Sequence, residues 1–73
     1  MLYRDPTEII VPVVERLARL DASGTVRREA IRALVRWKDE IASARATLAW
    51  VAQNDPEQDL QKVANEGLTR FAN

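Results

Sequence analysis

The chain has 73 residues, so we expect residues 1–73 to form a single small domain. Eleven basic and eleven acidic residues give zero net charge, which argues against a general attraction to nucleic acid or anionic lipid. The sequence has no cysteine and no histidine, which excludes disulfides, thiol chemistry, zinc sites of the usual type and an imidazole base.

The charge is unevenly distributed. Residues 1–38 hold eight basic and five acidic side chains, a balance of +3, and residues 39–73 hold three and six, a balance of −3. The longest apolar run, IIVPVV, is far too short to span a membrane, and no basic start with an apolar stretch and a cleavage site is visible. We therefore expect a soluble, cytoplasmic protein without a membrane contact.

Four helices are predicted in chain order. DPTE at residues 5–8 and DPEQ at residues 55–58 each combine an aspartate cap with proline in the first turn and an acid or amide three residues after the cap. Ser23 and Gly24 mark a turn between the first two helices. The helices are expected at about 5–20, 25–37, 39–53 and 55–71. No stretch alternates with a period of two, so the fold class is all-α.

A shift of 34 residues superimposes the second half of the sequence on the first. Under this shift Asp21 falls on Asp55, Val26 on Leu60, Ala30 on Ala64, Leu34 on Leu68, Trp37 on Phe71, Ile10 on Ala44, Val14 on Leu48, Leu17 on Val51 and Ala18 on Ala52. Because one shift aligns both helix pairs, the sequence predicts two antiparallel helical hairpins, repeat one at about 5–38 and repeat two at about 39–73.

The first copy resembles a HEAT repeat, which has a proline in its first helix, an aspartate in the turn and Val-Arg at the start of its second helix. The positions that match are Pro12, Asp21, Val26, Arg27, Ala30, Ala33 and Leu34. In the second copy Ala46, Gln61 and Gly67 replace the proline, the arginine and the second alanine. The resemblance implies a short right-handed α-solenoid of four helices, with a ladder of turn aspartates and helix arginines between neighbouring repeats.

Differences at matched positions predict how the hairpins stack. Val26, Ala30, Ala33, Leu34 and Trp37 share one side of the second helix and form its expected core face. On the flank of this face, Ile31 and Val35 correspond to Asn65 and Thr69, whereas Glu29 on the opposite flank corresponds to Val63. We therefore expect Ile31 and Val35 to pack on Val63 and Gly67, and the remaining polar residues to face water.

The first and third helices give the same direction of stacking. Ile9, Val13 and Leu20 correspond to Ser43, Thr47 and Asn54, and Glu15 on the other flank corresponds to Ala49. We expect the apolar flank of the first helix to be covered and polar residues to close both ends of the stack. Three repeats are normally the minimum for stability, so association with a partner or with a second copy is expected.

An arginine ridge on the second helix is the first candidate site. Arg28, Arg32 and Arg36 are spaced by four and lie on the side away from the core face, and their matches are Lys62, Glu66 and Arg70. The ridge fits a solvated surface, an acidic protein partner or a nucleic-acid backbone. A pairing of Arg32 with Glu66, zero net charge and the lack of a neighbouring aromatic residue argue against nucleic acid.

Trp50 is the second candidate, because it lies opposite Leu48 on the third helix and an exposed tryptophan is a typical interface anchor. The alternative is that Trp50 folds over the end of the stack or packs on Ala46.

Catalysis is not indicated by the sequence. Asp55, Glu57, Asp59 and Glu66 have spacings similar to a calcium loop, but Leu60 replaces the required glycine, so we assign the acids near residue 55 to helix capping. The hydroxyl side chains have no histidine to activate them, and the two glycines form no phosphate-binding loop. We predict no enzyme activity, cofactor, metal or small-molecule substrate.

The sequence favours a protein-protein interaction module, acting as an accessory subunit or adaptor and using Trp50, Arg28, Arg32, Arg36, Lys62, Glu66 and Arg70. The alternatives are a nucleic-acid-binding module that uses the arginine ridge and a homo-oligomeric structural protein, for which the opposite charges of the two halves would favour head-to-tail contacts.

Overall fold

The computed structural model describes residues 6–70. They form four α-helices, α1 (Pro6–Leu20), α2 (Gly24–Trp37), α3 (Ala42–Asn54) and α4 (Gln58–Thr69), and contain no strand. The predicted all-α fold class is confirmed.

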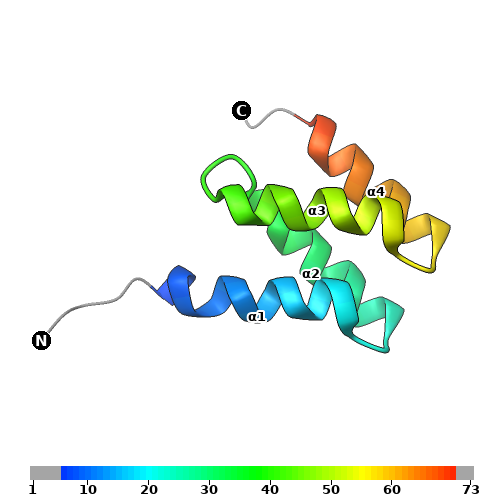
Figure 1. Ribbon diagram of the computed structural model, residues 1–73, viewed down its shortest axis with the longest axis horizontal. Coiled ribbons are helices and arrows are strands. Elements are labelled where there is room, and N and C mark those ends of the chain that lie inside the picture. Colours follow the sequence, from blue (N-terminus) through cyan, green and yellow to red (C-terminus); the bar gives the residue numbers. More distant parts are fainter. Residues whose placement is uncertain (1–5, 71–73) are drawn as a thin grey trace, which may run out of the picture.

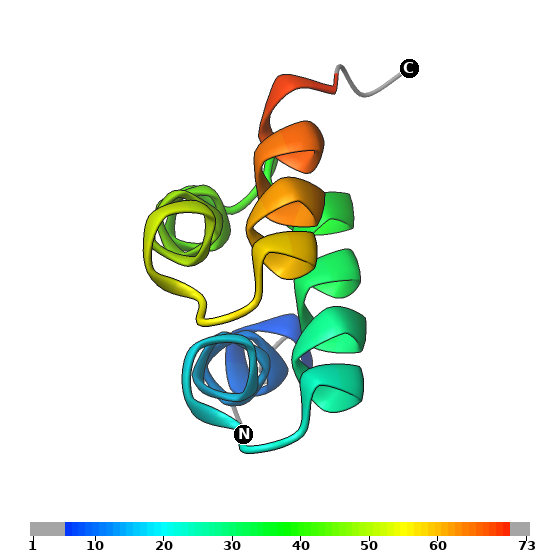
Figure 2. The same ribbon diagram turned by 90° about the vertical axis from the view of Figure 1, so that its right-hand side faces the viewer.

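The helices form two hairpins that stack in two layers. α1 packs on α2 and α3 packs on α4, and between the hairpins α1 contacts α3 and α2 contacts both α3 and α4. Figures 1 and 2 show α1 and α3 side by side in one layer, with α2 and α4 in the second layer crossing them at an angle. This arrangement leaves one open end at the first hairpin and another at the second.

The helix boundaries differ most from the predictions in α3 and α4. α3 begins at Ala42 instead of Asp39, because the backbone N–H groups of Glu40 and Ile41 both bond to the Trp37 carbonyl and close a turn there. α4 begins at Gln58, after Glu57 as its N-cap, and ends at Thr69. The predicted cap Asp5 and the predicted helix end Phe71 lie outside the described residues, and α1 continues through Pro12.

The core lies where the two hairpins meet. Its buried members are Ala18, Ala30, Ile31, Leu34, Ala44, Leu48, Val51, Leu60 and Ala64. The matched alanines Ala30 and Ala64 are both buried, as the repeat predicts, and Trp37 packs against this core in a half-buried position. Val26 was wrongly assigned to the core face: its side chain is 38% exposed, because it lies at the open end of the first hairpin.

The predicted stacking of α2 on α4 is confirmed. Ile31 is fully buried, and a Cβ atom added to Gly67 would overlap the Val35 Cγ2 atom, so the two helices approach closely at this glycine. Asn65 and Thr69 are exposed, as expected. The close approach sets the distance between the exposed sides of α2 and α4, where the candidate site lies.

α1 packs on α3, but the side of α1 that was predicted to be covered is wrong. Val13 is 56% exposed, whereas its match Thr47 is buried. The buried side of α1 instead carries Val11 and Ala18, seven residues apart on one side of the helix. α3 therefore turns its Thr47 side toward the first hairpin, and the apolar flank of α1 that includes Val13 faces solvent.

Candidate functional site

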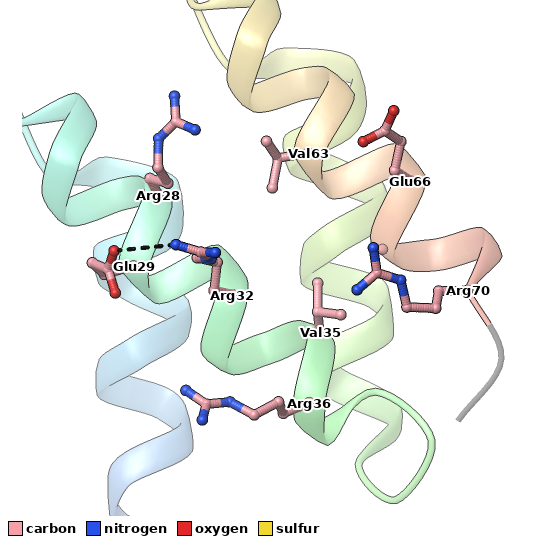
Figure 3. A pocket seen from close by; sticks show the side chains of 9 residues that line it. Arg28, Glu29, Arg32, Val35, Arg36, Val63, Glu66 and Arg70 are labelled. Atoms are coloured by element: carbon pink, nitrogen blue, oxygen red, sulfur yellow. Dashed lines mark ion pairs between the residues drawn. The ribbon is translucent and has the colours of Figure 1, made fainter. Parts of the chain in front are cut away.

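A groove of about 550 Å³ lies between the exposed sides of α2 and α4. Its lining consists of Arg28, Glu29, Arg32, Val35, Arg36, Val63, Glu66, Gly67 and Arg70 (Figure 3). Five of the seven residues that the sequence predicted for partner binding are thus brought together: Arg28, Arg32, Arg36, Glu66 and Arg70. The aliphatic side chains of Val35 and Val63 project between the two helices in Figure 3 and give the groove an apolar floor.

Local helix geometry places the arginines. Residues four apart lie one turn apart on the same side of an α-helix, so Arg28, Arg32 and Arg36 form a row about 6 Å apart along α2. Arg70 is the C-cap of α4, and its guanidinium points back over the groove in Figure 3. The groove is therefore bordered by guanidinium groups from both helices.

The charge of the lining is positive. Four arginines and two glutamates give 4 − 2 = +2. The ion pair recorded among these residues is Arg32 Nη1 to Glu29 Oε2 at 3.8 Å, between side chains that are 66% and 69% exposed. A contact this exposed contributes little and leaves the guanidinium available to a ligand.

The predicted pairing of Arg32 with Glu66 across the groove is not formed within residues 6–70. Glu29, three residues before Arg32 on the same helix, takes that place. In Figure 3 the Arg32 guanidinium extends toward Glu29, away from α4. The two acids therefore lie at the borders of the groove, and the space between the helices faces mainly arginine and valine side chains.

Lys62 and Trp50 do not join this groove. Lys62 is exposed on α4 but is absent from the lining, although its match Arg28 takes part. Trp50 is 42% exposed on α3, in the other layer, and the Asn54 side-chain amide donates a hydrogen bond to its carbonyl at 2.9 Å. A partner that touches both the groove and Trp50 would have to reach across both layers.

Arg27 joins the two hairpins, and its side chain is almost fully buried. Nε and Nη2 donate to the two carboxylate oxygens of Asp55 at 3.0 and 3.4 Å, and Nη2 also donates to Glu57 Oε2 at 2.6 Å. Nη1 donates to the carbonyls of Asp21 and Ala22 at 2.8 and 3.3 Å. These five hydrogen bonds match the five N–H groups of a guanidinium, so this buried charge is both neutralised and fully hydrogen-bonded.

Asp55 has a different role from the one predicted. It is the C-cap of α3 and is buried, instead of being the N-cap of α4. Besides binding Arg27, its carboxylate accepts a hydrogen bond from the Glu57 N–H at 2.8 Å, and its match Asp21 accepts one from the Ser23 N–H at 2.9 Å. Arg27 of the first hairpin thus binds the aspartate in the turn of the second hairpin.

Lys38 was missed by the sequence analysis, although it supports the groove. Its side chain is 3% exposed, and Nζ donates to the Arg70 carbonyl at 2.5 Å and to Asp39 Oδ2 at 3.2 Å. The ammonium thus holds the C-terminal end of α4 beside the end of α2. Its positive charge also interacts favourably with the negative, C-terminal end of the helix dipole. No periodicity distinguishes this lysine from a surface one; only the folded turn shows its burial.

Glu15 presents an unusual polar group. Its Oε2 atom is buried and lacks a hydrogen-bond partner within the described residues, while the side chain as a whole is half-buried on α1. Burial without a partner costs free energy, so this residue weakens the first hairpin.

Residues 6–70 contain no group of three or more acidic side chains that could hold a metal ion. None of their helices has the length and apolar character that a membrane crossing requires. Comparisons with protein-family models, with curated proteins and with solved structures found no match. The HEAT resemblance therefore stays a prediction from the sequence.

Proposed function

We propose that this chain is a small non-catalytic protein-binding module, an adaptor or accessory subunit, whose groove between α2 and α4 holds an acidic segment of another protein. The observation that carries the proposal is the composition of the groove. It combines a lining charge of +2 with an apolar floor, in a chain whose net charge is zero. Positive charge concentrated at one concave place fits a partner of opposite charge.

The spacing of the arginines suggests what the partner presents. Arg28, Arg32 and Arg36 form a row with a step of about 6 Å, which is the step of side chains four residues apart on another helix. A helix with glutamates at every fourth position can pair with this row, while aliphatic side chains beside them contact Val35 and Val63. The carboxylates would give orientation and the aliphatic contacts would give affinity.

The groove fits a protein better than a nucleic acid. Among residues 6–70 its lining contains no aromatic side chain on which a base could stack, and Val35 and Val63 contribute apolar side chains to it. The two glutamates on its borders would also repel a continuous phosphate backbone. Trp50 stays a candidate second contact for a partner large enough to reach α3.

Binding of defined probes tests this proposal. One probe is a fluorescein-labelled helical peptide of about 15 residues, long enough to form a helix, with glutamate at every fourth position and leucine beside it. The others are a single-stranded and a double-stranded oligonucleotide with the same label. We expect saturable binding of the peptide, weakened by added salt, and at least about tenfold weaker binding by the variant Arg32→Gln/Arg36→Gln/Arg70→Gln.

The control variant is Arg16→Gln/Arg19→Gln, which removes two exposed arginines of α1 that do not line the groove. It should keep the affinity of the unmodified chain. Equal losses in both variants would show a non-specific charge effect and contradict the groove. Tighter binding of either oligonucleotide than of the peptide would replace the proposal by nucleic-acid recognition.

A further inference from the structure

The first hairpin exposes an apolar surface that the groove does not use. We call it the α1 face; it consists of Ile9, Ile10, Val13 and Leu20 of α1 and Val26 at the start of α2. Their side chains are 57, 46, 56, 66 and 38% exposed, in that order. Within the described residues, Trp50 is the one other large hydrophobic residue with comparable exposure. Contiguous apolar surface of this kind marks an interaction site.

The matched residues of the second hairpin show what covers the equivalent surface there. Ile10, Val13 and Val26 correspond to Ala44, Thr47 and Leu60 of the second hairpin, which are 0, 5 and 1% exposed. Each hairpin covers its own residues in a similar way, so the additional burial in the second hairpin comes from the first hairpin stacked on it. Ile9 and Leu20 correspond to the exposed Ser43 and Asn54, so the part of the α1 face with Ile10, Val13 and Val26 is the side on which a repeat docks, and within residues 6–70 no other helix covers it.

The opposite end of the stack is polar. The residues with which the first hairpin meets the second include Ile31 and Val35, and their matches at the end of the second hairpin are Asn65 and Thr69, both exposed. A head-to-tail stack of two chains would place these polar groups on the aliphatic α1 face. Contact of two α1 faces with each other instead buries aliphatic side chains against aliphatic side chains.

The charge distribution leads to the same choice. The opposite charges of the two halves, +3 and −3, would favour head-to-tail contact if both were free. The structure pairs Arg27 of the first half with Asp55 and Glu57 of the second. One guanidinium neutralises one carboxylate, and Lys38 of the first half also pairs with Asp39 of the second, so +3 − 2 = +1 and −3 + 2 = −1 remain and much of the asymmetry is neutralised inside the chain.

Arg16 lies on the same side of the helix as Ile9 and Leu20, and its long aliphatic stem allows the guanidinium to stay in water when the α1 face is covered.

We propose that two copies of the chain associate through their α1 faces about a two-fold axis, with α1 of one copy antiparallel to α1 of the other. Unlike the head-to-tail stacking of the two hairpins, this contact joins the same face of both copies, and it yields a stack of four repeats closed by polar ends, which stops further growth. The grooves between α2 and α4 stay open in this dimer.

Cysteine cross-linking tests the geometry, because the natural chain has no cysteine. The variant Val13→Cys places a thiol near the middle of the α1 face, and Ala49→Cys places one at the exposed end of the second hairpin. Under mild oxidation we expect Val13→Cys chains to link rapidly to one another and Ala49→Cys chains to stay unlinked. Linking that occurs only in a mixture of the two variants would show head-to-tail stacking and overturn the proposal.

Sedimentation equilibrium of the full chain supplies the independent readout. The proposal predicts a mass that approaches twice 8.3 kDa and goes no higher as concentration rises. Val13→Glu should raise the dimer dissociation constant at least about tenfold, and circular dichroism should show whether the helices are retained. Ala49→Glu, at an exposed residue of α3 outside the α1 face, is the matched control. A chain that stays monomeric throughout, or a Val13→Glu variant that dimerises as the natural chain does, overturns the proposal whether or not the groove binds its peptide.

Discussion

Arg27 is the residue on which the joining of the two hairpins depends most. Its guanidinium is buried, and all of its N–H groups donate to Asp55, Glu57 and the turn carbonyls of the first hairpin. A buried ion pair of this kind contributes little net stability relative to an apolar pair of the same shape, but loss of one partner leaves a buried charge without compensation. The two acidic partners differ in exposure, which makes them a matched pair for mutation.

Asp55→Asn is therefore expected to destabilise the chain by about 3–5 kcal/mol, because its carboxylate is buried against Arg27. A domain of this size has only a few kcal/mol of stability, so the variant should be largely unfolded at 25 °C. Glu57→Gln, whose side chain is 54% exposed, should cost less than about 1 kcal/mol. Urea unfolding followed by circular dichroism measures both. Equal stability of the two variants would contradict the role of the buried pair.

Glu15 leads to a prediction of the opposite sign. Because its Oε2 atom is buried without a partner, Glu15→Leu should stabilise the chain by about 1 kcal/mol. Glu29→Leu, at an exposed glutamate of α2, should change stability by no more than about 0.5 kcal/mol. Thermal unfolding of the two variants gives the comparison. A lower melting temperature for Glu15→Leu would mean that the carboxylate has a stabilising contact.

The packing of α2 on α4 is the element-scale feature that forms the groove. Gly67 allows Val35 to lie against the backbone of α4, and a side chain at Gly67 would collide with a β-branched residue that has little freedom to move. This contact keeps the two helices close enough for Arg70 of α4 to face the arginine row of α2.

Gly67→Ala should accordingly destabilise the chain by about 1–2 kcal/mol, since the overlap with Val35 outweighs the gain in helix propensity. The double variant Gly67→Ala/Val35→Ala makes room for the added methyl group and should recover part of the loss. A double-mutant cycle from urea unfolding measures the coupling. Strictly additive effects of the two substitutions would show that the helices do not meet at this point.

Sequence reasoning predicted one layer of the stack correctly and the other wrongly. In α2 and α4 the apolar flank with Ile31 and Val35 corresponds to a polar flank with Asn65 and Thr69, and both helices follow that contrast. In α1 the same contrast was taken to mean that Val13 is covered, but Val13 is exposed. Apolar residues show that a surface favours burial; they do not show whether the partner belongs to the same chain.

Interactions that depend on tertiary distance were the hardest to predict. The row of Arg28, Arg32 and Arg36 follows from helix spacing alone and was found. Lys38 and Asp55 have sequence contexts typical of a surface lysine and a helix cap, and only the fold brings them to Arg70 and Arg27. Glu66 was predicted to pair with Arg32 across the groove. It lines the groove, but Arg32 pairs with Glu29, because helix periodicity does not determine in which direction a long side chain extends.

At the scale of the whole molecule, the two proposed surfaces lie on different helices. The groove belongs to α2 and α4, whereas the α1 face is formed mainly by α1. A dimer through the α1 faces would therefore present two grooves at once. A partner with two acidic segments would then bind more tightly than one segment binds a single groove, by an amount that depends on the linker between the segments.

The most direct test of the central claim is a ¹⁵N-labelled chain titrated with the unlabelled glutamate-rich helical peptide and followed by amide chemical shifts. We expect saturable shifts that cluster on residues 28–36 of α2 and 63–70 of α4, with the amides of α1 and α3 nearly unchanged. Shifts confined to α3 around Trp50, or no saturable shift on α2 and α4, would contradict the groove as the binding site.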